Sequence, residues 1–297
     1  MKINFNFFIF IFLSLFFNFS LHALEKKEIE SYISDLDYLF PIESMIFIKG
    51  GCFEMGDHFD EGNYNEIKKN ICINDYYIAE HEITQRQWIA VMGDNPSKNK
   101  TCGLECPVEN VSWNEIQQFI KELRNKVKIK YKLPTEAEWE FAARERGRKI
   151  RFGNGENILS HDAANFYSSI YFSKEYYLTE DRKLLGIVPI KQYKPNKLGI
   201  YDLVGNVSEW TDDWYFDQSF ENYLDENSVV PRYGKFKIIK GGSWYMPSIA
   251  VRNSFRKFSN PDSKNEELGF RLAISINNKS SAKGVIYSKE DFINMIL

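Results

Sequence analysis

Histidine is scarce in this chain of 297 residues. Four are present, His22, His58, His81 and His161, and they are scattered along the sequence. A catalytic metal centre with three histidine ligands usually shows two of them a few residues apart on one element. Because no such pair occurs, the sequence argues against an enzyme of the three-histidine metal type.

The chain also lacks an excess of positive charge. Its 38 Lys and Arg residues stand against 41 Asp and Glu residues, which gives a formal net charge of -3. No basic block is long enough to neutralise a phosphate backbone, so we expect no nucleic-acid partner. With 43% hydrophobic and 27% charged residues, the composition excludes a disordered or fibrous protein.

Long apolar runs are absent after residue 21. The run at 3–21 is followed by Ala23 and then by charged residues, which is typical of a secretory signal peptide over 1–23. The alternative is an uncleaved membrane anchor, since about 20 apolar residues span a bilayer. Asn4, Asn6 and Asn18 dilute the run. We therefore expect cleavage and a periplasmic or secreted protein, with membrane attachment only if the segment is retained.

The four cysteines all precede residue 107. An even number in an exported protein predicts disulfides. We expect Cys52 to pair with Cys72 and Cys102 with Cys106, because each pairing closes a short loop rich in turn residues. A zinc site with four cysteine ligands is the alternative, but it usually needs two close pairs and Cys52 lies far from Cys72 in the sequence.

The remaining chain reads as one domain over 42–275. It contains no Pro/Gly/Ser linker and no repeat of 20 to 50 residues. A charged, amphipathic lead-in over 24–41 precedes it, and a polar tail with a short apolar end follows over 276–297. Residues 45–51 predict a β-strand that ends in a glycine turn.

Two helices are predicted from their first residues. Ser112 with Glu115 forms a capping box before a helix over 113–126, and Thr135 with Glu138 repeats the pattern before a second helix. In the second helix Trp139 and two alanines are expected to face the core. Residues 145–200 carry few periodic stretches and predict ordered loops.

Seven phrases together resemble one family, the formylglycine-generating enzymes or sulfatase-modifying factors. In chain order they are GGCFEMG (50–56), EIT (82–84), PVENVSW (107–113), LPTEAEWE (133–140), LVGNVSEW (203–210), GGSW (241–244), and NPD (260–262) leading to LGFR (268–271). The resemblance extends from about 43 to 273. It implies an α+β fold, a single compact, loop-rich domain of C-type-lectin-like ancestry with few short helices and strands.

The resemblance also implies structural calcium. The ligands of one family site match Asp202, Gly205, Val207 and Glu209, the middle two through backbone carbonyls. From the residues alone, these hard oxygen donors are compatible both with calcium and with a turn that carries surface acids. The first two ligands of a second site match Asn165 and the carbonyl of Phe166, but the remaining ligands have no clear match.

That second site lacks a clear acid. Counting back from Pro189 puts Arg182 at the position of the carboxylate, with Asp181 one residue away and Leu184 as the carbonyl donor. A cation cannot replace a carboxylate ligand. The second site is therefore either shifted by one residue or lost.

The decisive departure concerns the catalytic cysteines. Family members that form formylglycine carry two cysteines shortly after the Gly-Gly-Ser phrase, and these bind copper as thiolates. Here Met246 matches the first cysteine and the second falls in a shortened segment. A thioether is a soft ligand for Cu(I), but one thioether does not replace two thiolates. We expect neither copper nor formylglycine formation by the family mechanism.

A second enzymatic branch of the family is also a poor match to this chain. Sulfoxide-forming iron oxygenases of the family carry an N-terminal helical bundle with histidine ligands, and residues 24–42 are too few to build it. Two hypotheses remain. The chain is a non-enzymatic member that binds a peptide, glycan or protein partner, or an unconventional tailoring enzyme similar to the periplasmic siderophore-maturation members.

The residues available to either hypothesis follow the Gly-Gly-Ser phrase. The cleft candidates are Ser243, Trp244, Tyr245, Met246 and Arg252, together with Arg256 and Arg271. Guanidinium groups here are suited to bind a carboxylate or a sulfate. The alternative is that Arg256 and Arg271 form structural ion pairs with Asp262, Glu266 or Glu209. For Ser243 no histidine base is apparent, so we do not predict a hydrolase.

Overall fold

The computed structural model describes residues 39–41, 44–63, 65–66, 68–127, 129–167, 186–216 and 234–276. The chain divides into two compact units between Pro41 and Ile42, and the elements below belong to the second unit. The expected signal segment 1–23, most of the lead-in 24–41 and the tail after residue 276 lie outside the described residues. Within the described ranges, no helix is both long enough and apolar enough to cross a membrane.

The described elements are short. In chain order they are β1 (Met45–Ile48), β2 (Gly51–Met55), β3 (Lys69–Ile73), β4 (Tyr76–Ala79), α2 (Gln85–Met92), the 3-10 turn η2 (Lys100–Cys102), α3 (Trp113–Val127), β5 (Tyr131–Lys132), α4 (Glu136–Ala143), β6 (Ser208–Trp214), β7 (Lys237–Lys240), the 3-10 turn η5 (Ser248–Ala250), β8 (Lys257–Ser259), β9 (Leu268–Gly269) and β10 (Ala273–Ser275).

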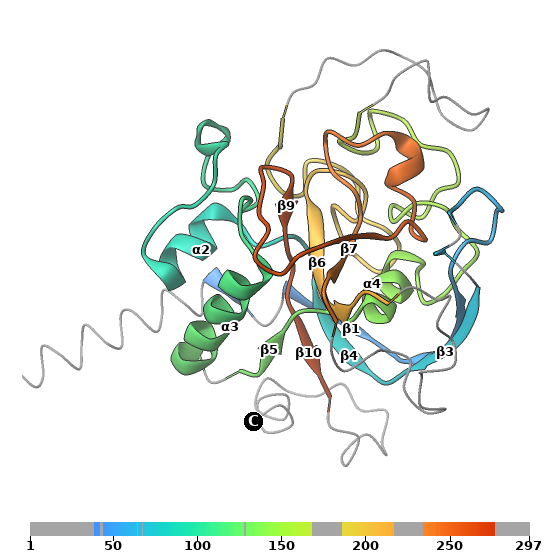
Figure 1. The fold of residues 1–297 in the computed structure, drawn as a ribbon, viewed down its shortest axis with the longest axis horizontal. Coiled ribbons are helices and arrows are strands. Elements are labelled where there is room, and N and C mark those ends of the chain that lie inside the picture. The colour runs from blue at the N-terminus through green and yellow to red at the C-terminus, as the bar shows by residue number, and fades with distance from the viewer. Residues whose placement is uncertain are drawn as a thin grey trace, which may run out of the picture. The chain divides into compact units, whose positions relative to one another are not determined.

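Three small sheets organise these strands. One has the order β1-β4-β10-β5, a second pairs β2 with β3, and the third has the order β8-β7-β6-β9. In Figure 1, helices α2 and α3 lie on one side of the central strand β6, and α4 lies on the other. Between α4 and β6, the described residues form loops joined by isolated bridges, as the sequence predicts for 145–200.

Both expected disulfides are confirmed. Cys52 on β2 lies directly opposite Cys72 on β3, and the two sulfur atoms are bonded. A second disulfide joins Cys102 and Cys106, which are four residues apart in sequence, and closes a short loop. All four cysteines are therefore oxidised, and none is available as a thiolate for zinc or copper.

The capping boxes begin the helices where the sequence predicts them. Ser112 and Glu115 exchange hydrogen bonds before α3, and Thr135 and Glu138 do the same before α4. Helix α2 was not predicted, although Thr84 and Gln87 form a capping box of the same kind. That helix has eight residues, which gives too few turns for a clear apolar period.

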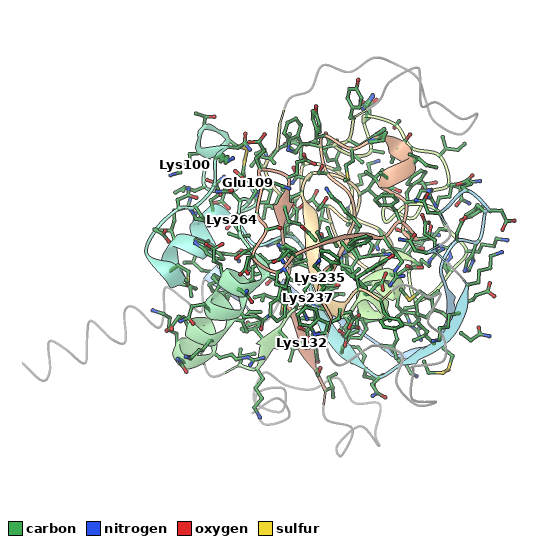
Figure 2. All side chains as sticks on the ribbon, in the orientation of Figure 1. Lys100, Glu109, Lys132, Lys235, Lys237 and Lys264 are labelled. Carbon is green, nitrogen blue, oxygen red and sulfur yellow. A yellow bond between two sulfur atoms is a disulfide. The ribbon has the colours of Figure 1, made fainter. Side chains whose placement is uncertain are left out.

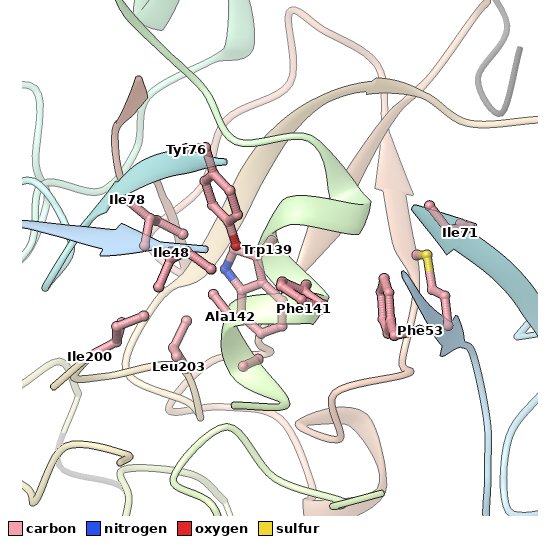
Figure 3. Packing of buried hydrophobic residues seen from close by; sticks show 12 residues of the cluster. Ile48, Phe53, Ile71, Tyr76, Ile78, Trp139, Phe141, Ala142, Ile200 and Leu203 are labelled. Atoms are coloured by element: carbon pink, nitrogen blue, oxygen red, sulfur yellow. The ribbon is translucent and has the colours of Figure 1, made fainter. Parts of the chain in front are cut away.

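Helix α4 lies between two sheets and carries the main apolar cluster. Trp139, Ala142 and Ala143 are fully buried, as predicted. Figure 3 shows Trp139 directed toward Tyr76 and the neighbouring strands, with Phe141 on the side of Phe53. The rings of Phe53 and Phe141 lie 5.1 Å apart, which links α4 to strand β2.

The same helix also buries charge. The Glu140 carboxylate accepts hydrogen bonds from Arg144 at 2.9 Å and from Lys240 at 3.0 Å, and all three side chains are at most 1% exposed. Glu136 is bound bidentately by Arg256 at 2.6 and 2.9 Å. Because an unpaired buried charge is costly, these partners from β7 and the C-terminal region are required for α4 to sit in the core.

A lysine is enclosed by aromatic rings where α3 meets β6. The Lys237 ammonium lies 4.0 Å from the centre of the Trp113 ring and 3.9 Å from that of Trp214, and it donates to the Asp212 carbonyl at 2.7 Å. Figure 2 marks Lys237 among the packed side chains near β7. Nearby, Asp213 accepts from the first backbone N–H of α4, and burial together with the Glu136 charge raises its pKa to about 7.

Candidate functional site

A buried carboxylate and a buried guanidinium form the centre of the site. Glu209 on β6 accepts two hydrogen bonds from Arg271, at 2.6 and 2.7 Å, and a third from the Trp139 indole at 2.8 Å. Glu209, Arg271 and Trp139 have no exposed surface. This confirms the structural alternative for Arg271 and removes that residue from the cleft candidates.

Two further carboxylates surround this ion pair. Glu82 is fully buried and accepts from the Asn206 amide at 2.8 Å and from the Val207 backbone at 3.1 Å. Burial, with the nearby charges of Asp202 and Glu209, raises the pKa of Glu82 well above its ordinary value. Burial also raises the pKa of Asp202 to about 6.

The charge balance of this carboxylate cluster, Glu82, Asp202 and Glu209, is negative. With Asp202 and Glu209 ionised and Glu82, whose pKa is raised, protonated, one guanidinium leaves about one negative charge. Asp202 is held by one backbone N–H, from Lys191 at 2.8 Å. Glu82 belongs to the EIT phrase, but the local sequence does not mark it as a site residue, because its partners lie more than 120 positions away.

The backbone of 202–206 is turned by left-handed residues. Asp202 has φ 56°, Gly205 has φ 74° and Asn206 has φ 56°. A Cβ on Gly205 would lie 2.0 Å from the carbonyl oxygen of Asn165, so only glycine fits at this crossing. The two segments expected to hold calcium, 165–166 and 202–209, therefore lie against each other.

Asparagine side chains hold this crossing together. Asn206 donates its backbone N–H to the Asn165 carbonyl at 2.8 Å, and Asn165 donates its amide to the Gly186 carbonyl at 2.9 Å. Phe166 is buried in an apolar cluster. The remaining candidates of the second calcium site, Asp181, Arg182 and Leu184, lie outside the described residues.

These observations bear on metal binding in different ways. Among the described residues, no three or more His, Cys, Asp or Glu side chains are grouped so that they could hold a metal ion. Glu209 already accepts three hydrogen bonds, which leaves it little capacity as a ligand. The Asp202 carboxylate and backbone carbonyls fit calcium as hard oxygen donors, and the excess negative charge fits a divalent cation.

An aromatic surface is joined by a backbone hydrogen bond to the segment 202–209. Tyr245 is 55% exposed, and its ring centre is 5.4 Å from that of Trp244 and 6.4 Å from that of Tyr167. The Trp244 backbone N–H donates to the Asn206 carbonyl at 2.9 Å. This bond links the aromatic residues to the segment that carries Asp202 and Glu209. We call Tyr167, Trp244 and Tyr245 the aromatic surface.

The chain neighbours of Tyr245 are held by packing and hydrogen bonds. Ser243 is fully buried and donates to the Glu267 carboxylate at 2.7 Å, so its hydroxyl is committed to a structural bond. Met246 packs against a buried apolar cluster, and its sulfur lies 4.0 Å from the Ser208 hydroxyl. Trp244 packs beside the disulfide of Cys102 and Cys106.

The prediction that Arg252 lines the cleft is wrong. Arg252 is 2% exposed, and its guanidinium binds the Glu66 carboxylate bidentately at 2.9 and 3.1 Å. This pair anchors the loop between β2 and β3. Arg256 is also structural, but its partner is Glu136 and not Asp262 or Glu266. Sequence spacing carries no signal for either pairing, because each partner lies at least 120 residues away.

Comparisons with known proteins agree on one family. Residues 36–276 match the family model described as the sulfatase-modifying factor enzyme 1-like domain. A protein named chaperone protein LppX from Paenibacillus barcinonensis is 29% identical over 242 residues, covering 68% of this chain and 79% of that protein. The formylglycine-generating enzyme of Mus musculus is 27% identical over 266 residues, covering 85% of this chain and 64% of the enzyme.

A solved structure has the same fold. The structure of Treponema denticola variable protein 1 aligns with a TM-score of 0.63 at 24% identity, covering 77% of this chain and 94% of that one. The α+β, loop-rich fold expected from the sequence is thereby confirmed. This likeness is one of fold, since fold alone does not carry function.

Proposed function

The chain belongs to the sulfatase-modifying factor enzyme 1-like family, and from this membership we propose that it is an exported binding or accessory module. Its partner is a protein, a peptide or a glycan bound at the aromatic surface. The observation that carries the proposal is the exposed Tyr245 ring between Trp244 and Tyr167, in a segment with no thiolate. Exposed aromatic groups with rigid support are typical contact residues of binding surfaces.

A relative supports an accessory role. The match to LppX covers 79% of that protein, and LppX is named a chaperone protein. A chaperone-like partner contact would involve an extended or partly folded segment of another protein. The disulfides support an oxidising compartment, in agreement with the expected signal peptide.

Selection from a random peptide library on the disulfide-intact protein tests this proposal. We expect the wild-type protein to enrich a sequence class that Tyr245→Ala binds at least about tenfold more weakly, since a central aromatic contact contributes about 2 kcal/mol or more. Phe47→Ala is the matched control, because Phe47 is also exposed, at 49%, but lies on strand β1. Equal binding by wild type and Tyr245→Ala would contradict the proposal.

Structural calcium forms a second part of the proposal. We place the ion at the Asp202 carboxylate with the backbone carbonyls of Gly205 and Val207, and its charge offsets the excess negative charge of the carboxylate cluster. Calcium at 100 times its dissociation constant would stabilise the fold by about 2.7 kcal/mol. The melting temperature should therefore rise with calcium and fall with a chelator. Asp202→Asn should abolish this response, whereas Asp60→Asn, at an exposed side chain, should retain it.

A catalytic alternative is favoured by the match to the mouse formylglycine-generating enzyme. In this alternative the chain is an unconventional tailoring oxidase or forms formylglycine itself. Mass spectrometry of a sulfatase-motif cysteine peptide, incubated with the copper-loaded protein and oxygen, distinguishes the two. Conversion beyond a copper-only control would favour the enzyme. An unchanged peptide would leave the binding role or an oxidase with a different substrate.

A further inference from the structure

Several cationic residues lie on two segments that are separate in sequence. The segment 144–151, which follows α4 and is drawn in yellow-green in Figure 1, contains Arg144, Arg146, Arg148, Lys149 and Arg151. The segment 191–197 adds Lys191, Lys194 and Lys197. Arg144 forms the buried pair with Glu140, and Arg151 pairs with Glu61, whereas Arg146, Arg148 and Lys149 are exposed. Parts of the two segments meet at one pocket.

This basic pocket has a volume of about 520 Å³, which is within the range of small-ligand sites. Its cationic lining residues are Arg148, Lys149 and Lys197, and its acidic ones are Glu145 and Glu156. None of the aromatic surface residues, the carboxylate cluster or the calcium candidates lines it. The pocket is therefore separate from the site proposed above.

The acids of the pocket do not neutralise its cations. Glu145 is buried, forms an ion pair with Arg148, and accepts the Lys197 backbone N–H at 2.9 Å, so its charge is already used. Among the described residues, the ammonium groups of Lys149 and Lys197 have no carboxylate partner. Of the lining acids, Glu156 alone is exposed to the pocket without a cationic partner in the described structure.

Two asparagine amides at the pocket are held in fixed positions. The Asn154 side-chain oxygen accepts the Glu156 backbone N–H at 3.2 Å, and the Asn157 side-chain oxygen accepts that of Arg151 at 2.9 Å. In both residues the backbone bond fixes the oxygen, so the NH₂ group is directed away from that bond. Within the described part of the chain these NH₂ groups donate to no acceptor, and they are available to a ligand.

Apolar surface completes the lining. Ile158 is 59% exposed, and Pro195 lies in the same pocket. No aromatic side chain is present among the lining residues, so the pocket offers no ring on which a nucleic-acid base would stack. Cations, amide donors, one free carboxylate and a small apolar surface together match a ligand with an acidic group, several hydroxyls and an apolar face.

We propose that the basic pocket binds an acidic saccharide, a sugar unit that carries a carboxylate or a sulfate. Lys149 and Lys197 neutralise the acidic group. The amides of Asn154 and Asn157 donate to ring or hydroxyl oxygens, and Glu156 accepts from hydroxyls. Ile158 and Pro195 contact the apolar face of the ring. Because both lysines are exposed, the affinity falls as salt concentration rises.

Calorimetric titration of the full chain with its disulfides intact tests this inference. The probes are a chondroitin 4-sulfate disaccharide, lactose as a neutral disaccharide, inorganic sulfate, and a single-stranded oligonucleotide of four residues. We expect the sulfated disaccharide to bind at least about tenfold more tightly than lactose or sulfate. The double variant Lys149→Gln/Lys197→Gln should weaken that binding at least about tenfold, whereas Lys121→Gln on α3 should not change it.

Three outcomes would overturn the proposal. Equal affinity for lactose would remove the role of the acidic group, and equal affinity for sulfate would remove that of the sugar. Tighter binding of the oligonucleotide would identify a nucleic-acid site instead. Tyr245→Ala should bind the disaccharide as the wild type does, so a failure here and a failure of the aromatic surface are distinguishable. A melting temperature for each variant verifies folding.

Discussion

Removing the charge of Asp213 should stabilise the protein above neutral pH. Asp213 lies on β6 next to the first residue of α4, and burial, with the Glu136 charge, raises its pKa from 3.8 to about 7. The folded protein therefore holds this proton more tightly than the unfolded chain. By linkage, the contribution of Asp213 to the free energy of unfolding is complete below pH 3.8 and is lost as pH rises to about 7.

The size of the effect follows from the shift. A difference of about three pKa units at about 1.4 kcal/mol per unit gives a loss of about 4 kcal/mol at pH 8, and solvent screening is small because the group is buried. In Asp213→Asn the side-chain oxygen still accepts the Glu136 N–H, and the amide stays neutral. The variant should gain on the wild type by about 1.4 kcal/mol per pH unit between pH 5 and pH 7.

Urea unfolding at pH 5, 6, 7 and 8 measures this difference. Asp60→Asn is the control, because the Asp60 side chain is 89% exposed and lies on the loop between β2 and β3, so its difference from the wild type should not change with pH over this range. A difference for Asp213→Asn that is constant across this range would refute the raised pKa. A difference that shrinks as pH rises would refute the sign of the argument.

Three further predictions concern stability. Phe141→Ala should lower the free energy of unfolding by about 3 to 5 kcal/mol, because the ring is 1% exposed and its removal leaves a cavity; urea unfolding measures the loss. Arg271→Met should cost about 3 to 5 kcal/mol, since it leaves a buried carboxylate without its counter-charge; a loss below about 1 kcal/mol would contradict that pairing. Replacing Cys52 and Cys72 by serine should cost about 3 kcal/mol from the closed loop of 20 residues, seen as a lower melting temperature that reducing agent lowers less than in the wild type, because the Cys102–Cys106 disulfide remains.

Local features of the fold were predictable because their causes are local. The capping boxes at Ser112 and Thr135 depend on residues three positions apart, and both helices begin where those residues predict. The strand at Met45–Ile48 and the short disulfide loop at Cys102 follow from neighbouring residues in the same way. Helix α2 shows the limit, since its cap was present in the sequence but its apolar pattern was too short.

The site was less predictable because its charges are paired over long distances. Arg252 reads as a cleft residue from its position after Ser243, yet its partner Glu66 is 186 positions earlier. Glu140 is likewise buried, and one of its partners, Lys240, lies 100 positions later. Sequence spacing indicates neither pairing, because buried ion pairs depend on which loops the tertiary structure brings together.

The buried acids of α4 have a consequence for the order in which the fold is completed. A nascent chain that ends before residue 237 has made α4 but lacks the two cations that later neutralise it, Lys240 and Arg256. In such an intermediate Arg144 can still pair with Glu140, but Glu136 lacks its Arg256 partner and has to stay solvated or protonated, which opposes early burial of the helix. Synthesis of nearly the whole domain therefore precedes its consolidation, and the segment after residue 236, about the last fifth of the chain, commits the preceding residues to the native state.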